Sequence, residues 1–194
     1  KFEDVTERAK IGSPEGGNMA LFFDSDHDGD LDLFEAGTRP ERLFRNNSDG
    51  TFLEQAGKMG LTGGDAASVD AAFGDFDQDG DIDFIVVNEN SGNILYSNQR
   101  QGVFKDVGQS GLKSGGDAGS VAVGDYDNDG FLDLFFPSLK GAVPDLYRNK
   151  NNGTFELAGN TAEMFSLLKN VNVYDASFFD FDNDGFLDLV IAGE

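Results

Sequence analysis

The 194-residue sequence has no cysteine, no tryptophan and a single histidine. Without cysteine, the chain can form neither a disulfide framework nor a thiolate site for a metal or for redox chemistry. No apolar run approaches the roughly 18 residues of a membrane span, so we expect no direct membrane insertion. The first residues, KFEDVTERAK, lack the apolar core of a signal peptide, so any targeting segment is expected outside this sequence.

Positive charge is also scarce. The sequence has 14 Lys and Arg against 36 Asp and Glu, a formal net charge of −22. Because nucleic acids bind cationic surfaces, this balance excludes a nucleic acid partner and argues equally against an anionic membrane. A hydrophobic content of 39%, with 12% aromatic residues, is nevertheless typical of a folded domain.

Groups suited to catalysis are missing too. The one histidine, His27, lies inside an acidic loop, and the carboxylates outside these loops have no spacing that pairs them for acid–base chemistry. Asp65, Asp117 and Asp175 precede or open expected strands and could line the mouth of a channel, although a turn or cap role is commoner. We therefore predict a protein that is not an enzyme.

What the sequence does contain is a repeat. An acidic motif occurs four times, as DSDHDGDLD (24–32), DFDQDGDID (75–83), DYDNDGFLD (125–133) and DFDNDGFLD (180–188), at steps of 51, 50 and 55 residues. Two further markers keep the same interval: RLFRNN, ILYSNQ and LYRNKNN, and then GTFLE, GVFKDV and GTFEL. A period of this length indicates a structural repeat rather than local low complexity.

Each repeat is interpreted as four short strands, which predicts an all-β fold, a β-propeller of four-stranded antiparallel blades. After each acidic loop, apolar residues alternate, as in Ile82, Phe84 and Val86, which is typical of a strand with one buried face. In 160–171, the spacing of Met164, Leu167 and Leu168 predicts a short helix inserted between blades, with a plain loop as the alternative. The predicted repeats are approximately 7–56, 57–107, 108–158 and an incomplete 159–194, with 1–6 as the last strand of a preceding blade.

About four blades are therefore expected. We favour a fragment of a larger propeller, and a closed ring of four blades is the alternative.

The acidic motif, D-x-D-x-D-G-x-x-D, reads as a list of oxygen ligands. If the chain bends at the position 6 glycine, the carboxylates at positions 1, 3 and 5 can surround a cation. The backbone carbonyl of position 7 then points toward the cation, and the Asp at position 9 completes the ring of oxygen ligands. Oxygen ligands without His, Cys or Met favour Ca²⁺, so we predict four Ca²⁺ sites. The predicted side-chain ligands are Asp24, Asp26, Asp28 and Asp32; Asp75, Asp77, Asp79 and Asp83; Asp125, Asp127, Asp129 and Asp133; and Asp180, Asp182, Asp184 and Asp188, while Asp30, Asp81, Phe131 and Phe186 would bind through the backbone carbonyl.

Two other interpretations of the motif are open. Asp and Gly are ordinary turn residues, so the loops could be acidic turns without a metal. An EF-hand loop also begins D-x-D-x-D-G, and Glu35 supplies the Glu that an EF-hand requires at position 12. The other loops have Val86, Phe136 and Ile191 there, and their flanks alternate as strands do, so we interpret Glu35 as a coincidence.

The segment AAFGDFDQDGDIDFIVVNENSGNILYSNQRQGVFKDV (71–107) resembles the FG-GAP/VCBS-type repeat, found in the propeller of integrin α-subunits and in many bacterial secreted proteins. The resemblance extends over nearly the whole chain. It implies blades around a central axis, with Ca²⁺ held in the hairpin between the first and second strands by positions 1, 3, 5, 7 and 9. Integrin-type propellers have seven blades, which also favours a fragment here.

Three functions follow as expectations. The first is an extracellular, calcium-stabilised scaffold for protein binding or adhesion, in which four Ca²⁺ would change the formal charge from −22 to −14 (−22 + 8). The second is a carbohydrate-binding, lectin-like propeller. The third is a structural subunit that assembles head to tail through strand complementation. The ligand, protein or glycan, is not identified by the sequence.

Overall fold

The computed structural model describes residues 1–12, 16–37, 40–61, 67–89, 91–108, 110–112 and 118–194. It is an all-β structure with three four-stranded antiparallel sheets and one two-stranded sheet. Each sheet takes its strands in chain order, so consecutive strands are neighbours. The strands of sheet 1 are β1 (Met19–Phe23), β2 (Asp32–Ala36), β3 (Arg42–Asn46) and β4 (Phe52–Glu54); of sheet 2, β5 (Ser68–Gly74), β6 (Asp83–Asn88), β7 (Ile94–Asn98) and β8 (Phe104–Asp106). The strands of sheet 3 are β9 (Ala122–Gly124), β10 (Asp133–Phe136), β11 (Asp145–Asn149) and β12 (Phe155–Leu157); of sheet 4, β13 (Val173–Phe179) and β14 (Asp188–Gly193).

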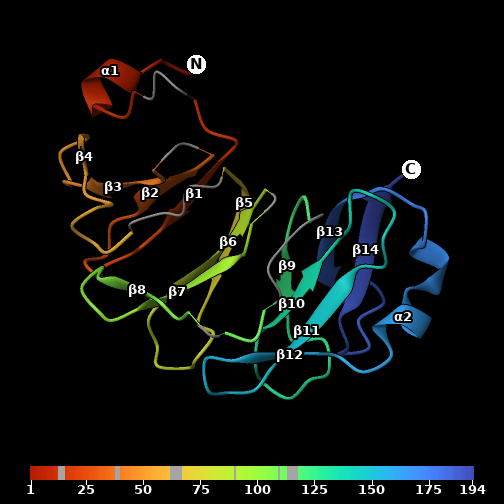
Figure 1. Ribbon diagram of the computed structural model, residues 1–194. Helices are drawn as coiled ribbons and strands as arrows, with labels where there is room; N and C mark the ends of the chain where they lie inside the picture. Colours follow the sequence, from red (N-terminus) through yellow and green to blue (C-terminus); the bar gives the residue numbers. More distant parts are fainter. Residues whose placement is uncertain (13–15, 38–39, 62–66, 90, 109, 113–117) are drawn as a thin grey trace.

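The sheets follow one another along an arc, from the β1–β4 sheet to the β13–β14 sheet (Figure 1). Their first strands lie on the inside of this arc, where β1 contacts β5, β5 contacts β9 and β9 contacts β13. Three apolar cores fill the spaces between neighbouring sheets. Each core contains a pair of Phe rings in contact: Phe23 with Phe84, Phe76 with Phe155, and Phe135 with Phe178.

The second strands of sheets 2 and 3 are buried on both faces, whereas the sequence pattern predicted strands with a single buried face. In β6, the residues from Phe84 to Val87 are at most 1% exposed. The reason is that sheet 2 stands between two others: Phe84 and Val86 belong to the core shared with sheet 1, and Ile85 and Val87 to the core shared with sheet 3. The predicted alternation is seen in β14 of the outermost sheet.

The N-terminal residues do not form the strand expected at 1–6. Residues 1–5 have no regular structure, the short helix α1 (Thr6–Ala9) follows, and the Phe2 side chain is fully exposed. A strand needs a neighbour for its backbone N–H and C=O groups, and no described strand pairs with residues 1–5. The assignment of 1–6 to a preceding blade stays a prediction.

The helix predicted within 160–171 is confirmed, but its buried face is not the expected one. The segment forms α2 (Thr161–Met164) and the 3₁₀ turn η1 (Ser166–Leu168). Met164 is 55% and Leu167 90% exposed, whereas Leu168 is half-buried and Phe165 packs on Phe135. None of the helices in the described ranges has the length and apolar composition needed to span a bilayer.

Gly111 approaches β12 too closely to accept a side chain. Its φ is +82°, a Cβ there would lie 2.1 Å from the carbonyl oxygen of Phe155, and Phe155 N donates to Ser110 O at 2.6 Å. We expect Gly111→Ala to lower the free energy of unfolding by about 3 kcal/mol, from a left-handed backbone and a displaced hydrogen bond. Urea unfolding measures this.

The matched control is Gly153, whose φ is +72° but whose Cβ would meet nothing within 4 Å. Gly153→Ala should lower the free energy of unfolding by about 1 kcal/mol, which is the cost of a left-handed backbone conformation alone. Equal losses in the two variants would contradict the close approach at Gly111.

Candidate metal centres

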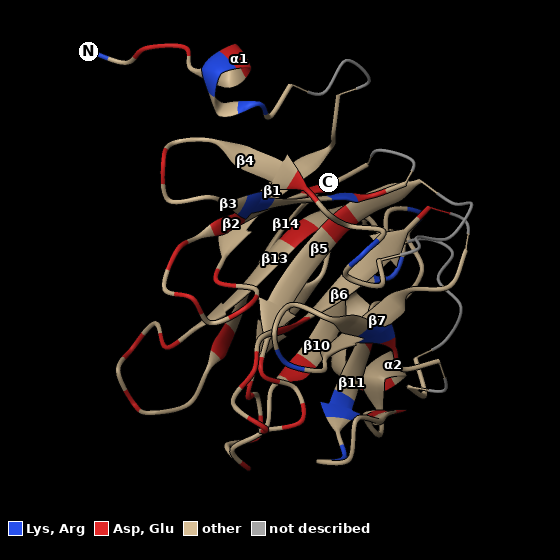
Figure 2. Ribbon diagram, turned by 90° about the vertical axis from the view of Figure 1, so that its left-hand side faces the viewer, with Lys and Arg blue, Asp and Glu red and all other residues tan. Residues whose placement is uncertain are grey.

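The four acidic loops join the first strand of each sheet to the second and share one backbone conformation. We number them loop 1 (24–32), loop 2 (75–83), loop 3 (125–133) and loop 4 (180–188). Acidic residues gather on the loops at one end of the sheets, opposite α1 (Figure 2). The position 4 residue is left-handed in every loop, with φ between 57° and 60°, and the position 6 glycine has φ between 89° and 91°. These values are those of His27, Gln78, Asn128 and Asn183, and of Gly29, Gly80, Gly130 and Gly185.

Two side chains in each loop fold back on the backbone. In loop 2, the position 1 carboxylate, Asp75, accepts Gly80 N at 3.1 Å, and the position 5 carboxylate, Asp79, accepts Asp81 N at 2.9 Å. These bonds stabilise the bend at position 6 and turn the loop around its centre. The same pair of bonds, each from a backbone N–H to a carboxylate, recurs in the other loops. The pairs are Gly29 to Asp24 and Asp30 to Asp28 in loop 1, Gly130 to Asp125 and Phe131 to Asp129 in loop 3, and Gly185 to Asp180 and Phe186 to Asp184 in loop 4.

The position 9 carboxylate ties the loop to the third strand of its sheet. In loop 2, Asp83 Oδ2 accepts Phe76 N at 3.0 Å, and Asp83 Oδ1 accepts Asn98 N at 2.8 Å. Asp83 is 2% exposed, so this carboxylate organises a buried region. Asp32 makes the equivalent bonds with Ser25 and Asn46, Asp133 makes them with Tyr126 and Asn149, and Asp188 accepts Phe181 N.

Carboxylate oxygens converge at the centre of every loop. In loops 2, 3 and 4, the side chains at positions 1, 3 and 9 each place an oxygen within 4.8 Å of the others; in loop 1, positions 1, 3 and 5 do so. The position 5 residues Asp79, Asp129 and Asp184, and Asp32 of loop 1, lie outside these triads. The triads are Asp24, Asp26 and Asp28; Asp75, Asp77 and Asp83; Asp125, Asp127 and Asp133; and Asp180, Asp182 and Asp188.

The donor set fits a hard cation. Asp24 Oδ1, Asp26 Oδ1 and Asp75 Oδ1 are buried and accept no hydrogen bond from any residue that the structure describes. A buried carboxylate oxygen without a partner is costly unless a cation compensates it. Since every side chain in the triads offers oxygen, the set suits Ca²⁺ better than zinc or copper.

Burial also raises the pKa values of several loop carboxylates. Burial, with the charges of Asp77 and Asp79 adding to it, raises the pKa of Asp83 to about 7, although two backbone N–H groups oppose the shift. Burial likewise raises the pKa of Asp133 to about 6, and it raises the pKa values of Asp32 and Asp77. A cation among these groups would favour their charged forms and lower the pKa values again.

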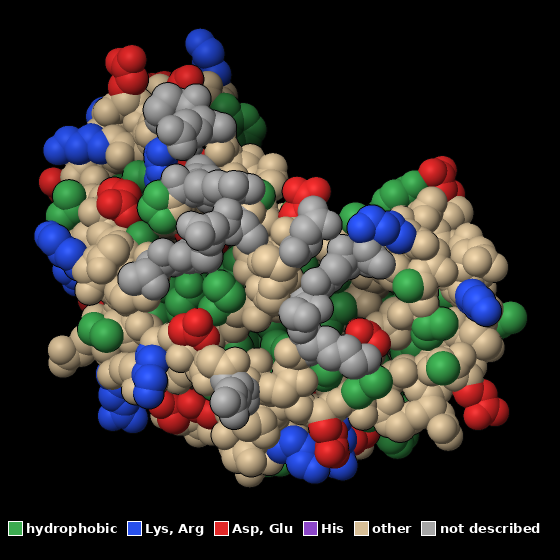
Figure 3. Space-filling view, in the orientation of Figure 1, with side chains coloured by type: hydrophobic (Ala, Val, Ile, Leu, Met, Phe, Trp, Pro, Cys, Tyr) green, Lys and Arg blue, Asp and Glu red, His purple; other side chains and the backbone are tan. Residues whose placement is uncertain are grey.

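An arginine from the third strand lies beside two of the loops. Arg148 on β11 reaches Asp127 Oδ2 and Asp129 Oδ2, both at 2.7 Å. Arg45 on β3 makes the same pair of contacts, with Asp26 Oδ2 at 2.5 Å and Asp28 Oδ2 at 2.8 Å. In Figure 3, acidic and basic side chains lie side by side along the lower edge of the molecule. The guanidinium thus engages one oxygen of each carboxylate and leaves Asp26 Oδ1 to the centre of its loop.

The side chains at positions 4 and 7 turn away from the loop centres. Asp81 pairs with His27 Nε2 at 3.0 Å and with Arg100 Nε at 3.1 Å, and Asp30 accepts a hydrogen bond from Ser48 Oγ. Strands flank every loop, so the EF-hand interpretation is wrong, and Glu35 lies in β2. Assignment of individual ligands at positions 1, 3, 5, 7 and 9 stays a prediction.

Sequence reasoning missed the residues that support the loops from the third strand. These residues belong to the second repeated motif (RLFRNN, ILYSNQ and LYRNKNN), to which the sequence analysis gave no role. They are two arginines, Arg45 and Arg148, and three asparagines whose backbone N–H groups donate to the position 9 carboxylates, Asn46, Asn98 and Asn149. The regular spacing of this motif was the available signal. Of the three acidic residues considered for a channel mouth, Asp65 and Asp117 lie outside the described residues, and Asp175 accepts the N–H of Ala176.

A family comparison identifies the repeat. The model of the FG-GAP-like repeat matches residues 24–86, 75–136 and 141–191. The chain belongs to the FG-GAP-like repeat family. The three matches in this FG-GAP-like chain together include all four acidic loops.

Individual relatives are more distant. This FG-GAP-like chain is 27% identical over 166 residues to cartilage acidic protein 1 of Homo sapiens and 26% identical over 166 residues to that of Xenopus tropicalis. Each match covers 79% of this chain but 24% and 25% of the relative, so the chain spans about a quarter of their length. A solved structure of an Agrocybe aegerita lectin, described by its specific recognition of non-reducing terminal N-acetylglucosamine, aligns with a TM-score of 0.58 and 17% identity, over 89% of this chain and 46% of that one. At this identity the likeness concerns the fold alone.

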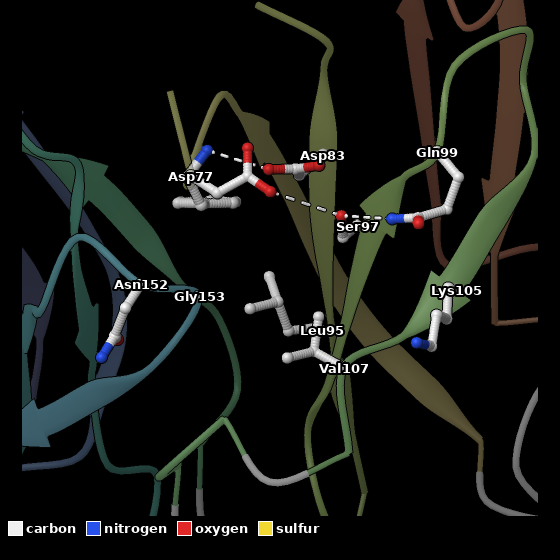
Figure 4. Close-up of a pocket in the computed structure, with 10 residues that line it drawn as sticks. Asp77, Asp83, Leu95, Ser97, Gln99, Lys105, Val107, Asn152 and Gly153 are labelled. Carbon is white, nitrogen blue, oxygen red and sulfur yellow. Dashed lines mark hydrogen bonds between the residues drawn. The ribbon is translucent and has the colours of Figure 1, made fainter. Parts of the chain in front are cut away.

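A pocket of about 250 Å³ lies next to loop 2. Asp77 and Asp83 stand on one side with Ser97, and Asn152 and Gly153 from the β11–β12 turn stand opposite (Figure 4). Asp77 accepts Ser97 Oγ at 3.5 Å, and Ser97 Oγ accepts Gln99 Nε2 at 2.9 Å. The pocket therefore combines a candidate metal centre with neutral polar groups and the apolar floor of Leu95 and Val107.

Proposed function

We propose that this chain is a calcium-stabilised extracellular β-propeller segment that serves as a scaffold for protein binding or adhesion. Its successive sheets would be blades, with their first strands around the axis. Support comes from the FG-GAP-like repeats and from the contacts between successive inner strands. The buried carboxylate oxygens without hydrogen-bond donors, in loops of one shared conformation, are the observation that carries the role of calcium.

In this proposal Asp83 and its equivalents have a double role. Each would contribute negative charge to the metal centre while holding the loop to the third strand through backbone N–H groups. Bound Ca²⁺ supplies the positive charge that the acidic loops lack. Extracellular modules bind Ca²⁺ with dissociation constants of about 10⁻⁴ to 10⁻³ M, which millimolar calcium occupies, and affinities in this range would support the extracellular location that we propose.

The test is a calcium titration of the chelator-treated chain by calorimetry. We expect about four Ca²⁺ per chain, one for each loop, and much weaker binding of Mg²⁺, which demands a stricter octahedral geometry. Fewer than three bound Ca²⁺ would refute the proposed role of the loops.

Carbohydrate binding is the second candidate function, and the pocket beside loop 2 favours it. Ser97, Gln99, Lys105 and Asn152 could donate hydrogen bonds to sugar hydroxyls there. A glycan array, read with and without chelator, separates the candidates. A protein scaffold gives no glycan signal, whereas a lectin gives one that Ser97→Ala together with Asn152→Ala reduces.

Strand complementation is the third candidate. Among the described residues, β14 pairs with β13 and with no third strand, so one edge of sheet 4 is open. An open edge can accept a strand from another molecule. Light scattering over a concentration series tests this: growth in size supports head-to-tail assembly, and a monodisperse monomer contradicts it.

A further inference from the structure

Consecutive acidic loops are joined by a buried asparagine. Asn149, on β11 of sheet 3, donates its Nδ2 to Leu132 O of its own loop at 3.1 Å and to Phe76 O of loop 2 at 2.8 Å. Asn149 is 2% exposed and Phe76 is 1% exposed, so water does not compete for these bonds. The same bridge joins loops 1 and 2, where Asn98 donates to Ile82 O and to Ser25 O.

The asparagine bridge makes an unbroken path between two candidate metal centres. In loop 2, Phe76 N donates to Asp83 Oδ2 while Phe76 O accepts from Asn149. In loop 3, Asn149 N donates to Asp133 Oδ1 at 2.8 Å. Phe76 and Asn149 thus connect the position 9 carboxylate of one loop to that of the next, and all four residues are at most 2% exposed.

A second set of contacts joins the loops at their exposed side. The position 4 residue of one loop reaches the bend of the next: Gln78 Nε2 donates to Gly130 O at 2.6 Å, and Asn128 Nδ2 to Gly185 O at 2.9 Å. His27 makes the corresponding contact with Asp81. Each interface between loops therefore has a contact through position 4, and the buried bridge recurs at two of them.

We propose that these bridges couple calcium binding at neighbouring loops, so that an ion at one loop raises the affinity of the next. The proposal rests on the proposed function of the loops as calcium sites. Ordering the position 9 carboxylate of loop 3 fixes Asn149, which in turn fixes Phe76 and the position 9 carboxylate of loop 2. The first ion thus meets part of the conformational-entropy cost of ordering the neighbouring loop. The second ion then binds a loop that is already partly ordered, and it binds more tightly.

The experiment follows the amide NMR signal of Gly80, in loop 2, during a calcium titration of the whole chain. Loop 3 is disabled by Asp127→Ala, a position 3 residue that takes no part in the bridge. We expect this change to shift the Gly80 midpoint to about fivefold higher calcium or more, the lower end of typical coupling between sites. An unchanged Gly80 midpoint would show independent sites and overturn the proposal.

The bridge itself is tested in a second background. With Asn149→Ala present, Asp127→Ala should no longer shift the Gly80 midpoint. The matched control is Asn46→Ala: Asn46 occupies the equivalent place on β3 and bonds Leu31 O of its own loop, but no acidic loop precedes loop 1 in this sequence. Loss of coupling in the Asn46 variant too, or full coupling without Asn149, would contradict the assigned route.

The comparison with Asp127→Ala leaves the bridge unchanged, so an unchanged Gly80 midpoint overturns the proposal even if Asn149→Ala fails to fold. It also separates the two proposals. If no loop glycine signal responds to calcium, the proposed function is wrong and the coupling falls with it. If the loops bind calcium with independent midpoints, the proposed function stands and the coupling alone is wrong.

Discussion

Calcium at ten times its dissociation constant is expected to raise the midpoint of thermal unfolding by about 12 to 24 °C. An ion present at ten times its dissociation constant adds about 1.4 kcal/mol per site if it binds the folded chain alone, or about 6 kcal/mol for four loops. For a chain of this size, about 2 to 4 °C accompanies each kcal/mol. Calorimetry or circular dichroism, with calcium or with chelator, measures the shift.

Net charge demands a control in this experiment. Because the chain carries a formal charge of −22, any added cation screens self-repulsion and can raise the midpoint. Magnesium at the same concentration, in the same background salt, gives the size of that general effect. A midpoint that chelator leaves unchanged, or a shift that magnesium reproduces in full, would contradict specific sites.

Removal of one position 9 carboxylate is the second large effect expected. Asp83→Ala leaves Phe76 N and Asn98 N without their acceptor in a buried region and removes a predicted ligand. Each unpaired buried N–H costs about 1 to 3 kcal/mol, so we expect a loss of about 3 kcal/mol or more even without calcium. Urea unfolding in chelator gives the structural part, and the loss of one bound Ca²⁺ gives the part due to the metal.

Asp81, two residues earlier, is the matched control. Its side chain pairs with His27 and Arg100 rather than facing the loop centre, so Asp81→Ala should keep the full calcium stoichiometry. Asp83→Asn, which keeps one carbonyl oxygen as acceptor, should lose less stability in chelator than Asp83→Ala and still bind calcium poorly. Equal stoichiometry in the Asp81 and Asp83 variants would contradict the distinction between positions 7 and 9.

Features fixed by local residue patterns were predictable from the sequence. The interval of about 50 residues, the four short strands and the bend at each position 6 glycine follow from spacing and from turn chemistry, and the structure has them in three complete sheets. The helix within 160–171 was found for the same reason. The side chains that it buries were not predicted in full: Phe165 packs on Phe135, whereas Met164 and Leu167 are exposed, because the segment divides into two short turns, α2 and η1, instead of one continuous helix.

Features that depend on the neighbouring sheet could not be predicted. The alternation in 82–86 describes one face of β6, but Ile85 and Val87 are buried by sheet 3, which lies about 50 residues further along the chain. The bridge from Asn149 to Phe76 spans 73 residues. An Asn in a strand marker gives no sign of such a partner until the sheets are placed side by side.

Anomalous diffraction from crystals grown with calcium tests the central claim most directly, because it locates each ion rather than counting them. We predict one peak within each loop, among the oxygens of positions 1, 3 and 5 in loop 1 and of positions 1, 3 and 9 in loops 2, 3 and 4, so that the peak of loop 2 lies next to Asp75, Asp77 and Asp83. Loops without peaks, or peaks confined to carboxylates elsewhere on this acidic surface, would contradict the account.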